Sequence, residues 1–154
     1  MDIEKRNKLI SIVLGIIIIV LGYYLYDSIV TPYQVVIERQ QMTEKVRTRM
    51  SDVRDGLVRY ESKRDSFPDN LDSLIAWIRT DSLMRSQADS TLNGSMDGPF
   101  NADSLMYSPR TGKRFQYILN DTLRPPIYLL QDPDTEDNIG DTLKTTQLNA
   151  ASWE

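Results

Sequence analysis

The stretch Leu9–Tyr26 constrains this chain more than any other feature. It holds 18 residues without a charge, and about 18 or more apolar residues can cross a hydrocarbon core roughly 30 Å thick. Inside that core the backbone must pair its own N–H and C=O groups, so a single span must be a helix. The alternative is a cleaved signal peptide, but its apolar region usually has about 7–15 residues and ends at a small-residue site. The sequence therefore predicts a transmembrane helix over 9–26.

Basic residues flank this stretch on one side only. Lys5, Arg6 and Lys8 precede it, and no basic residue follows until Arg39. Because an excess of Lys and Arg marks the cytoplasmic side, residues 1–8 are predicted to be a short cytoplasmic tip. Tyrosines gather at the other end of the stretch, where amphipathic rings suit the headgroup layer: Tyr23, Tyr24, Tyr26 and Tyr33. The pattern predicts a single-pass protein, held by a signal anchor in the lipid bilayer, whose C-terminal part lies outside the cytoplasm.

A long helix is predicted from Thr31 to about Lys63. Thr is a good N-cap and Pro fits the first helical position, so a new helix or a kinked continuation begins here. Apolar side chains then recur at spacings of four and three and form one face: Met42, Val46, Met50, Val53, Leu57 and Tyr60. A helix of this length measures about 50 Å, more than a small domain covers. We therefore expect Met42, Val46 and Met50 to form a seam to a partner helix, and the later positions to pack on the chain's own sheet.

The remaining sequence predicts an α+β domain. A second helix follows Asp69, with Leu71, Leu74, Ile75 and Ile78 on one face. Residues 80–104 are polar and predict a loop with at most a helical turn at 82–86. Three late segments favour strands of a small antiparallel sheet, namely 105–107, 114–119 and 127–130, with 127–130 central. The expected organisation is a helical stalk over 27–52 and an α+β domain over 53–154, in which the long helix covers the sheet.

Composition limits the chemistry. The chain has no Cys and no His, which excludes disulfides, thiol nucleophiles and any Ser-His-Asp arrangement. Residues 31–64 carry a net charge of +3 and residues 65–154 a net charge of −7. A basic stalk and an acidic domain argue against nucleic acid as a partner. We expect a protein that is not an enzyme.

Two further features have competing interpretations. An acidic stretch offers oxygen ligands of the kind that Ca²⁺ prefers, and its carboxylates are Asp132, Asp134, Glu136, Asp137 and Asp141. Solvated loop charge is the alternative, and no other cofactor is expected. Trp153 near the C-terminus either closes the core or docks on a partner as a buried aromatic anchor.

The order of these elements resembles that of type IV pilins and of the pseudopilins of type II secretion systems. The match is carried by 59–74 (RYESKRDSFPDNLDSL) and by the turn 108–117 (SPRTGKRFQY). The resemblance implies a pilin-like fold and, at the acidic stretch, the place where major pseudopilins hold calcium. Prepilins carry a Gly before the cleavage point and an early Glu in the mature helix. Gly15 and Gly22 lack such neighbours, so processing by a prepilin peptidase is not expected.

A second resemblance is to a group of uncharacterised single-span envelope proteins of Gram-negative bacteria. It rests on 53–60 (VRDGLVRY), 71–75 (LDSLI) and 149–154 (NAASWE). It implies an inner-membrane protein with a periplasmic domain. Together these features predict a structural or assembly subunit that meets other membrane or periplasmic subunits through its transmembrane helix and stalk. The alternative is a calcium- or ligand-binding module on a membrane anchor.

Overall fold

A computed structural model of the chain describes residues 3–94 and 98–154, apart from the side chains of residues 31 and 32. It contains five helical segments and three strands in these ranges: α1 (Ile3–Arg64), α2 (Leu71–Thr80), α3 (Ser82–Thr91), η1 (Ala102–Met106), β1 (Gln116–Asn120), β2 (Ile127–Gln131), β3 (Asn138–Gly140) and η2 (Thr145–Gln147). The chain divides into two units, Met1–Gln41 and Met42–Glu154. Helix α1 contributes residues to both. The class is α+β, as predicted.

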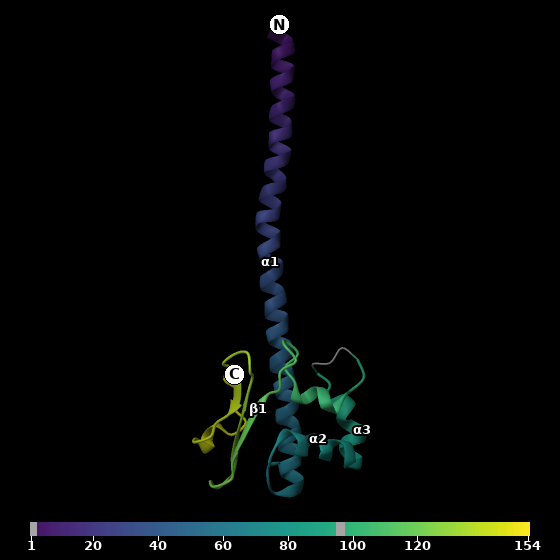
Figure 1. The fold of residues 1–154 in the computed structure, drawn as a ribbon, viewed down its shortest axis with the longest axis vertical. Coiled ribbons are helices and arrows are strands. Elements are labelled where there is room, and N and C mark those ends of the chain that lie inside the picture. Colours follow the sequence, from purple (N-terminus) through teal and green to yellow (C-terminus); the bar gives the residue numbers. More distant parts are fainter. Residues whose placement is uncertain (1–2, 95–97) are drawn as a thin grey trace. The chain divides into compact units, whose positions relative to one another are not determined.

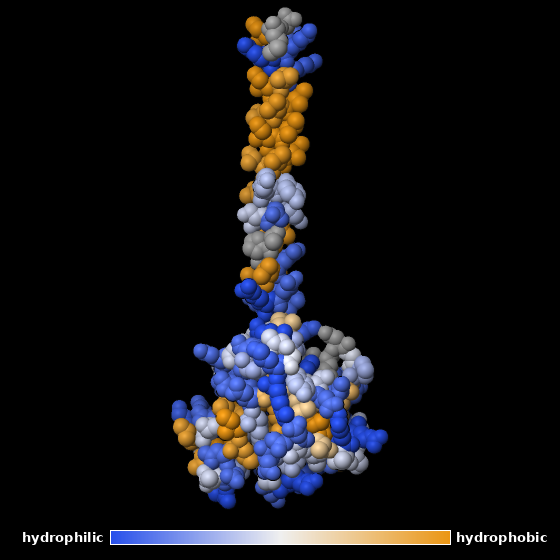
Figure 2. Space-filling model, in the orientation of Figure 1, coloured by the Kyte–Doolittle hydropathy of each residue, from blue (hydrophilic) through white to orange (hydrophobic). Residues whose placement is uncertain are grey.

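The first unit consists of helix α1 as far as Gln41, and none of its most apolar 18-residue window is buried within the chain. This helix is long and apolar enough to cross a membrane. Figure 2 shows a continuous apolar band on the visible face of this helix. The backbone is helical across residues 31 and 32. The helix is therefore continuous here, and the expectation of a new helix that begins at Thr31 is wrong.

The second unit is built around the C-terminal part of α1, which lies between the sheet on one side and α2 and α3 on the other (Figure 1). Val46, Met50, Val53 and Leu57 are at most 1% exposed and belong to one hydrophobic core. The expected burial of Val53 and Leu57 in the chain's own core is confirmed, and Tyr60 is partly buried against that core. The expected exposure of Val46 and Met50 is wrong, because the chain's own core encloses both side chains. Met42 is half-buried.

Helix α2 has the amphipathic face that the sequence predicted. Leu71, Leu74, Ile75 and Ile78 are buried, and Asn70 caps the helix by accepting a hydrogen bond from the Ser73 N–H at 2.8 Å. The ring of Trp77, also buried, meets that of Tyr60 on α1 edge to face, with centroids 5.2 Å apart. Aromatic pairs of this geometry stabilise a core beyond the area they bury. They join α2 to α1.

Helix α3 occupies part of the polar stretch that was predicted as a loop, and it includes the helical turn predicted at 82–86 but continues to Thr91. Only Met84 and Ala88 are buried along it, so its apolar pattern is too sparse to read from the sequence. Its start is fixed by Asp81, whose side chain accepts hydrogen bonds from the N–H groups of Leu83 and Met84. A capped helix of this kind needs little apolar surface of its own, because the cap satisfies N–H groups that have no partner within the helix.

The sheet has the strand order β1-β2-β3 and is antiparallel throughout. Strand β2 is central and mostly buried, as predicted. The third strand differs from the prediction, because β3 lies at 138–140 inside the acidic stretch. Of the predicted strand 105–107, the first two residues belong to η1, and Tyr107 forms only an isolated antiparallel bridge with Arg114. Gly140 has φ of +83°, and a Cβ there would lie 2.1 Å from the Tyr128 carbonyl oxygen. Glycine is required at this position because β2 and β3 approach so closely.

Acid should weaken the second unit through Asp81. The pKa of Asp81 is lowered by the hydrogen bond from the Met84 N–H and by the Lys63 ammonium, which lies 2.9 Å from the carboxylate. Because the pKa of Asp81 is lower in the folded state than in the unfolded state, where it is near 3.8, its ionised carboxylate stabilises the fold above that pH. This stabilisation is lost as the pH falls through the folded-state pKa. We expect the melting temperature of wild type to fall more between about pH 5 and about pH 3 than that of Asp81→Asn. Thermal melts measure this, with Glu44→Gln as the surface control. An equal fall in melting temperature for wild type, Asp81→Asn and Glu44→Gln would contradict the prediction.

Candidate functional site

Two of the five predicted metal ligands form ion pairs with basic side chains of the same chain. Asp137 accepts two hydrogen bonds from the Arg47 guanidinium, at 2.8 Å from Nε and 3.0 Å from Nη2. This contact raises the pKa of Arg47. Asp134 accepts hydrogen bonds from the Lys113 ammonium at 2.8 Å and from the Thr111 hydroxyl. The bond from Lys113 is the main reason that the pKa of Asp134 is lowered. These contacts tie the acidic stretch to α1 and to the turn before β1.

The other three carboxylates have separate surroundings. Asp132 is 1% exposed, and its Oδ2 accepts a hydrogen bond from the Thr135 hydroxyl at 2.8 Å. Asp141 accepts from the Leu143 and Lys144 N–H groups, and the first of these bonds is the main cause of its lowered pKa. Glu136 is exposed. The structure does not bring the five together, and within the described ranges no three acidic side chains are placed to hold a metal ion.

Two loops contact α1 beside the seam predicted from Met42, Val46 and Met50, namely the turn before β1 and the connection between β2 and β3. The Arg110 Nη2 donates to the Thr43 hydroxyl at 3.0 Å, in addition to the contact between Arg47 and Asp137. The helix-length argument underestimated the domain because these loops extend beyond the strands along α1. Val46 and Met50 are therefore part of the core and not a docking surface.

Trp153 lies at the edge of the core, packed against buried residues and half-exposed. The Arg47 guanidinium lies 5.2 Å from the centre of its ring, within the range of a cation–π contact. The neighbouring backbone pairs with β3, since the Ser152 N–H donates to the Asn138 carbonyl at 2.9 Å. The Glu154 carboxylate also pairs with Arg54 on α1 at 3.0 Å. Of the two roles expected for Trp153, this position favours closing the core.

The largest exposed apolar surface belongs to the first unit. Its Ile, Leu and Val side chains between residues 9 and 25 are 46–74% exposed. A helix that is apolar on all sides is stable only where its surroundings are apolar, as in a protein core or a membrane. Lys5, Arg6 and Lys8 precede this surface and are themselves exposed. This surface is the chain's foremost candidate functional site.

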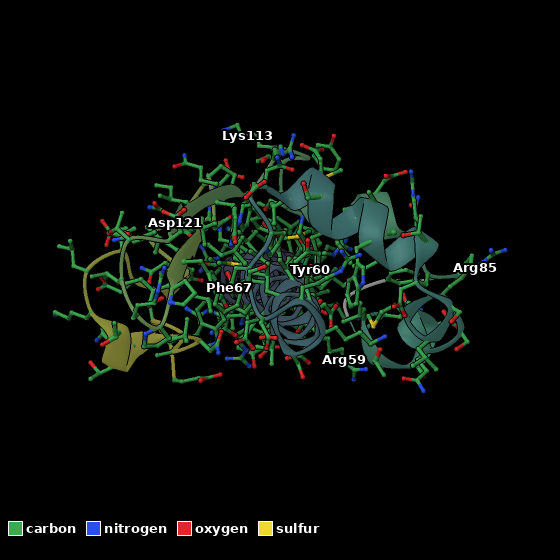
Figure 3. All side chains as sticks on the ribbon, turned by 90° about the horizontal axis from the view of Figure 1, so that it is seen from below. Arg59, Tyr60, Phe67, Arg85, Lys113 and Asp121 are labelled. Atoms are coloured by element: carbon green, nitrogen blue, oxygen red, sulfur yellow. The ribbon has the colours of Figure 1, made fainter. Side chains whose placement is uncertain are left out.

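A pocket of about 590 Å³ beside α2 and α3 was not predicted from the sequence. Its lining includes the apolar residues Ile78, Ala88 and Phe100 and the basic residues Arg79 and Arg85. The Arg79 guanidinium is paired with Asp103, and Figure 3 shows Arg85 pointing away from the body of the unit. The pocket depends on α3, so it could not be predicted from a stretch that was interpreted as a loop.

Comparisons of the chain with protein-family models, with curated proteins and with solved structures found no match. The class of the fold rests on the long α1 and on the three-stranded antiparallel sheet. The resemblance to pilins and pseudopilins stays a prediction.

Proposed function

We propose that this chain is a single-span, non-enzymatic structural or assembly subunit of an inner-membrane complex, with a pilin-like α+β domain in the periplasm. One observation carries the proposal: the apolar side chains between residues 9 and 25 are 46–74% exposed. Exposed apolar surface of this extent has a large cost in water and none in lipid. The bilayer is thus the first partner of the chain.

The second unit supports the proposal by being complete in itself. Its core draws on α1, α2, η1 and the sheet, and residues near its C-terminus close one edge. Such a domain needs no apolar surface from the first unit. The chain has neither His nor Cys, so the commonest general base and the thiol nucleophile are missing. A domain of this kind on an anchor serves best as a platform for other subunits.

Orientation follows from charge. The three basic residues before the apolar stretch favour a cytoplasmic N-terminus, and this supports a second unit on the opposite side of the membrane. Stable membrane complexes form through packing between helices and through contacts between the domains they carry. We expect both kinds of contact.

Isolation in mild detergent tests the proposal. The full chain, tagged at its C-terminus, should co-purify with other membrane or periplasmic proteins and give native masses above that of the monomer. A chain that begins at Met42 is the control, since it retains the folded unit and lacks the apolar helix. Partners that depend on the helix should be lost from it. A strictly monomeric full chain without co-purifying proteins would overturn the proposal.

A further inference from the structure

We infer that a pocket at the end of α1 binds a Lys or Arg side chain of an extended segment of a partner protein. The pocket, here called the α1-end pocket, has a volume of about 430 Å³ and is lined by parts of 65–69 and 119–126. It lies beside the C-terminal ends of α1 and β1. The inference rests on the proposed function, because it names the chemistry of one partner.

Part of the lining of the α1-end pocket is apolar and is here called its floor: Phe67, Leu119 and Pro126. Phe67 is 6% exposed, and its ring meets that of Tyr128 edge to face at 5.0 Å. Figure 3 looks onto this end of the second unit, with Phe67 beside α1 and Asp121 toward the sheet. A floor that is already packed in the free protein loses little entropy when a ligand binds.

The loop that carries part of the rim is also held in place. The Tyr117 hydroxyl on β1 donates to the Pro68 carbonyl at 2.9 Å, and the Asp65 N–H donates to the Glu61 carbonyl at 2.7 Å. Asp65 itself has φ of +55°, so it takes the left-handed conformation in which the chain leaves the helix. The carboxylates of this loop therefore sit on an ordered backbone.

Three carboxylates line the pocket: those of Asp65, Asp69 and Asp121. In the part of the chain that the structure describes, none of the three accepts a hydrogen bond or forms an ion pair. Arg124 also lines the pocket, but its Nη1 donates to the backbone carbonyls of Asp121 and Leu123 at 2.7 and 3.0 Å. The pocket thus has more negative than positive charge, with no carboxylate neutralised.

Nearby cations are directed elsewhere. The Lys63 ammonium is paired with Asp81, and the Arg64 guanidinium lies 5.9 Å from the centre of the Tyr60 ring. Over residues 3–94 and 98–154, no three acids are grouped closely enough for one metal ion. An organic cation matches this spread of charge better than a metal does. Its positive end can lie among the carboxylates while its aliphatic part covers the floor.

Lys and Arg side chains have this construction, since a flexible apolar stem carries the charge. Pockets of roughly 300–1,000 Å³ accept small ligands, so this one admits such a side chain with part of its neighbours. Arg is also enriched at protein interfaces. The exposed rim gives each ionic contact modest strength, so binding should weaken as salt is raised.

The test uses the full chain in detergent micelles and a peptide that carries fluorescein at its N-terminus, fluorescein-Gly-Arg-Leu-Arg-Gly-amide. Fluorescence anisotropy should show saturable binding, and the same peptide with Gln in place of Arg should not bind. The double variant Asp69→Asn/Asp121→Asn should weaken binding by about fivefold or more, as the loss of two exposed ionic contacts implies. The charge-matched control Glu44→Gln/Glu136→Gln changes two exposed carboxylates outside the pocket and should bind as wild type does.

Equal weakening in both double variants would overturn the inference, because it would show attraction to net charge and not to a site. Unchanged binding by Asp69→Asn/Asp121→Asn would also overturn it. The last measurement compares the binding of free spermidine with that of the Arg peptide. Tighter binding of spermidine would assign the pocket to polyamines instead. If partners still co-purify with Asp69→Asn/Asp121→Asn, the proposed function stands without this pocket. If none co-purify with wild type, the proposed function itself fails.

Discussion

Val46→Asp should unfold the second unit. The side chain is 0% exposed and lies in the hydrophobic core that α1 shares with the sheet and with α2. A carboxylate there would be taken out of water without a partner, and the methyl contacts of Val46 would be lost as well. We expect the free energy of unfolding to fall by about 4 kcal/mol or more, the range that marks severe disruption of a core. Near-ultraviolet circular dichroism of Trp77 and Trp153, followed with temperature, measures this.

Val58→Asp is the matched control for this substitution. Val58 is on the same helix but 39% exposed, and surface changes usually alter stability by no more than about 0.5 kcal/mol. Its melting curve should therefore stay close to that of wild type. If Val46→Asp melted at the same temperature as Val58→Asp, the early part of the second unit would not be core, and the partner seam would have to be reconsidered.

Two carboxylates in the apolar stretch should detach the chain from membranes. Leu14 and Ile18 are 56% and 62% exposed in the structure, and both lie near the middle of the stretch. A charged residue at the centre of a spanning helix costs about 2.5–3.5 kcal/mol on insertion scales. Leu14→Asp/Ile18→Asp should therefore cost about 6 kcal/mol and move most of the chain out of membranes washed at high pH. Immunoblots of the washed membranes and the supernatant give the two fractions.

Val36→Asp/Gln40→Asp repeats the same spacing farther along the helix. Both positions are exposed and lie beyond the apolar stretch. This variant should stay in the membrane fraction to the same extent as wild type. If both double variants were lost from the membrane fraction, the position of the added carboxylates would not matter. Retention in the membrane would then depend on the total charge of the chain and not on the absence of charge within 9–26.

The elements with continuous or strictly periodic apolar residues could be predicted from the sequence. The uncharged run of Leu9–Tyr26 needs no tertiary information, because its length and composition alone match a bilayer. Helix α2 has its buried residues on one face, and β2 is a short apolar run between turn residues. For these elements the local pattern and the final packing agree, so the pattern was sufficient.

Elements held by distant or polar contacts could not be predicted. Helix α3 depends on the cap at Asp81, and β3 depends on pairing with β2 and with the C-terminal residues. The acidic stretch suggested a metal site because its carboxylates are close in sequence. In the structure Asp137 pairs with Arg47, a residue 90 positions away. A partner so far along the chain leaves no local signal.

The burial of Val46 and Met50 shows the same limit. Their spacing identified the correct face of α1, but the extent of the domain along the helix depends on loops around 110 and 137 that reach back to Thr43 and Arg47. Periodicity gives the direction of a helix face and not what covers it.

Labelling of single cysteines most directly tests the central claim, that α1 spans a membrane once and holds the second unit outside the cytoplasm. The chain has no Cys, so each introduced thiol is the only one. Three variants suffice: Asn7→Cys before the apolar stretch, Ile18→Cys within it, and Leu143→Cys on the second unit, where Leu143 is 80% exposed. A membrane-impermeant maleimide added to intact spheroplasts should label only Leu143→Cys, and Asn7→Cys should react once the membrane is opened. Labelling of Ile18→Cys, or protection of Leu143→Cys in intact spheroplasts, would contradict the account.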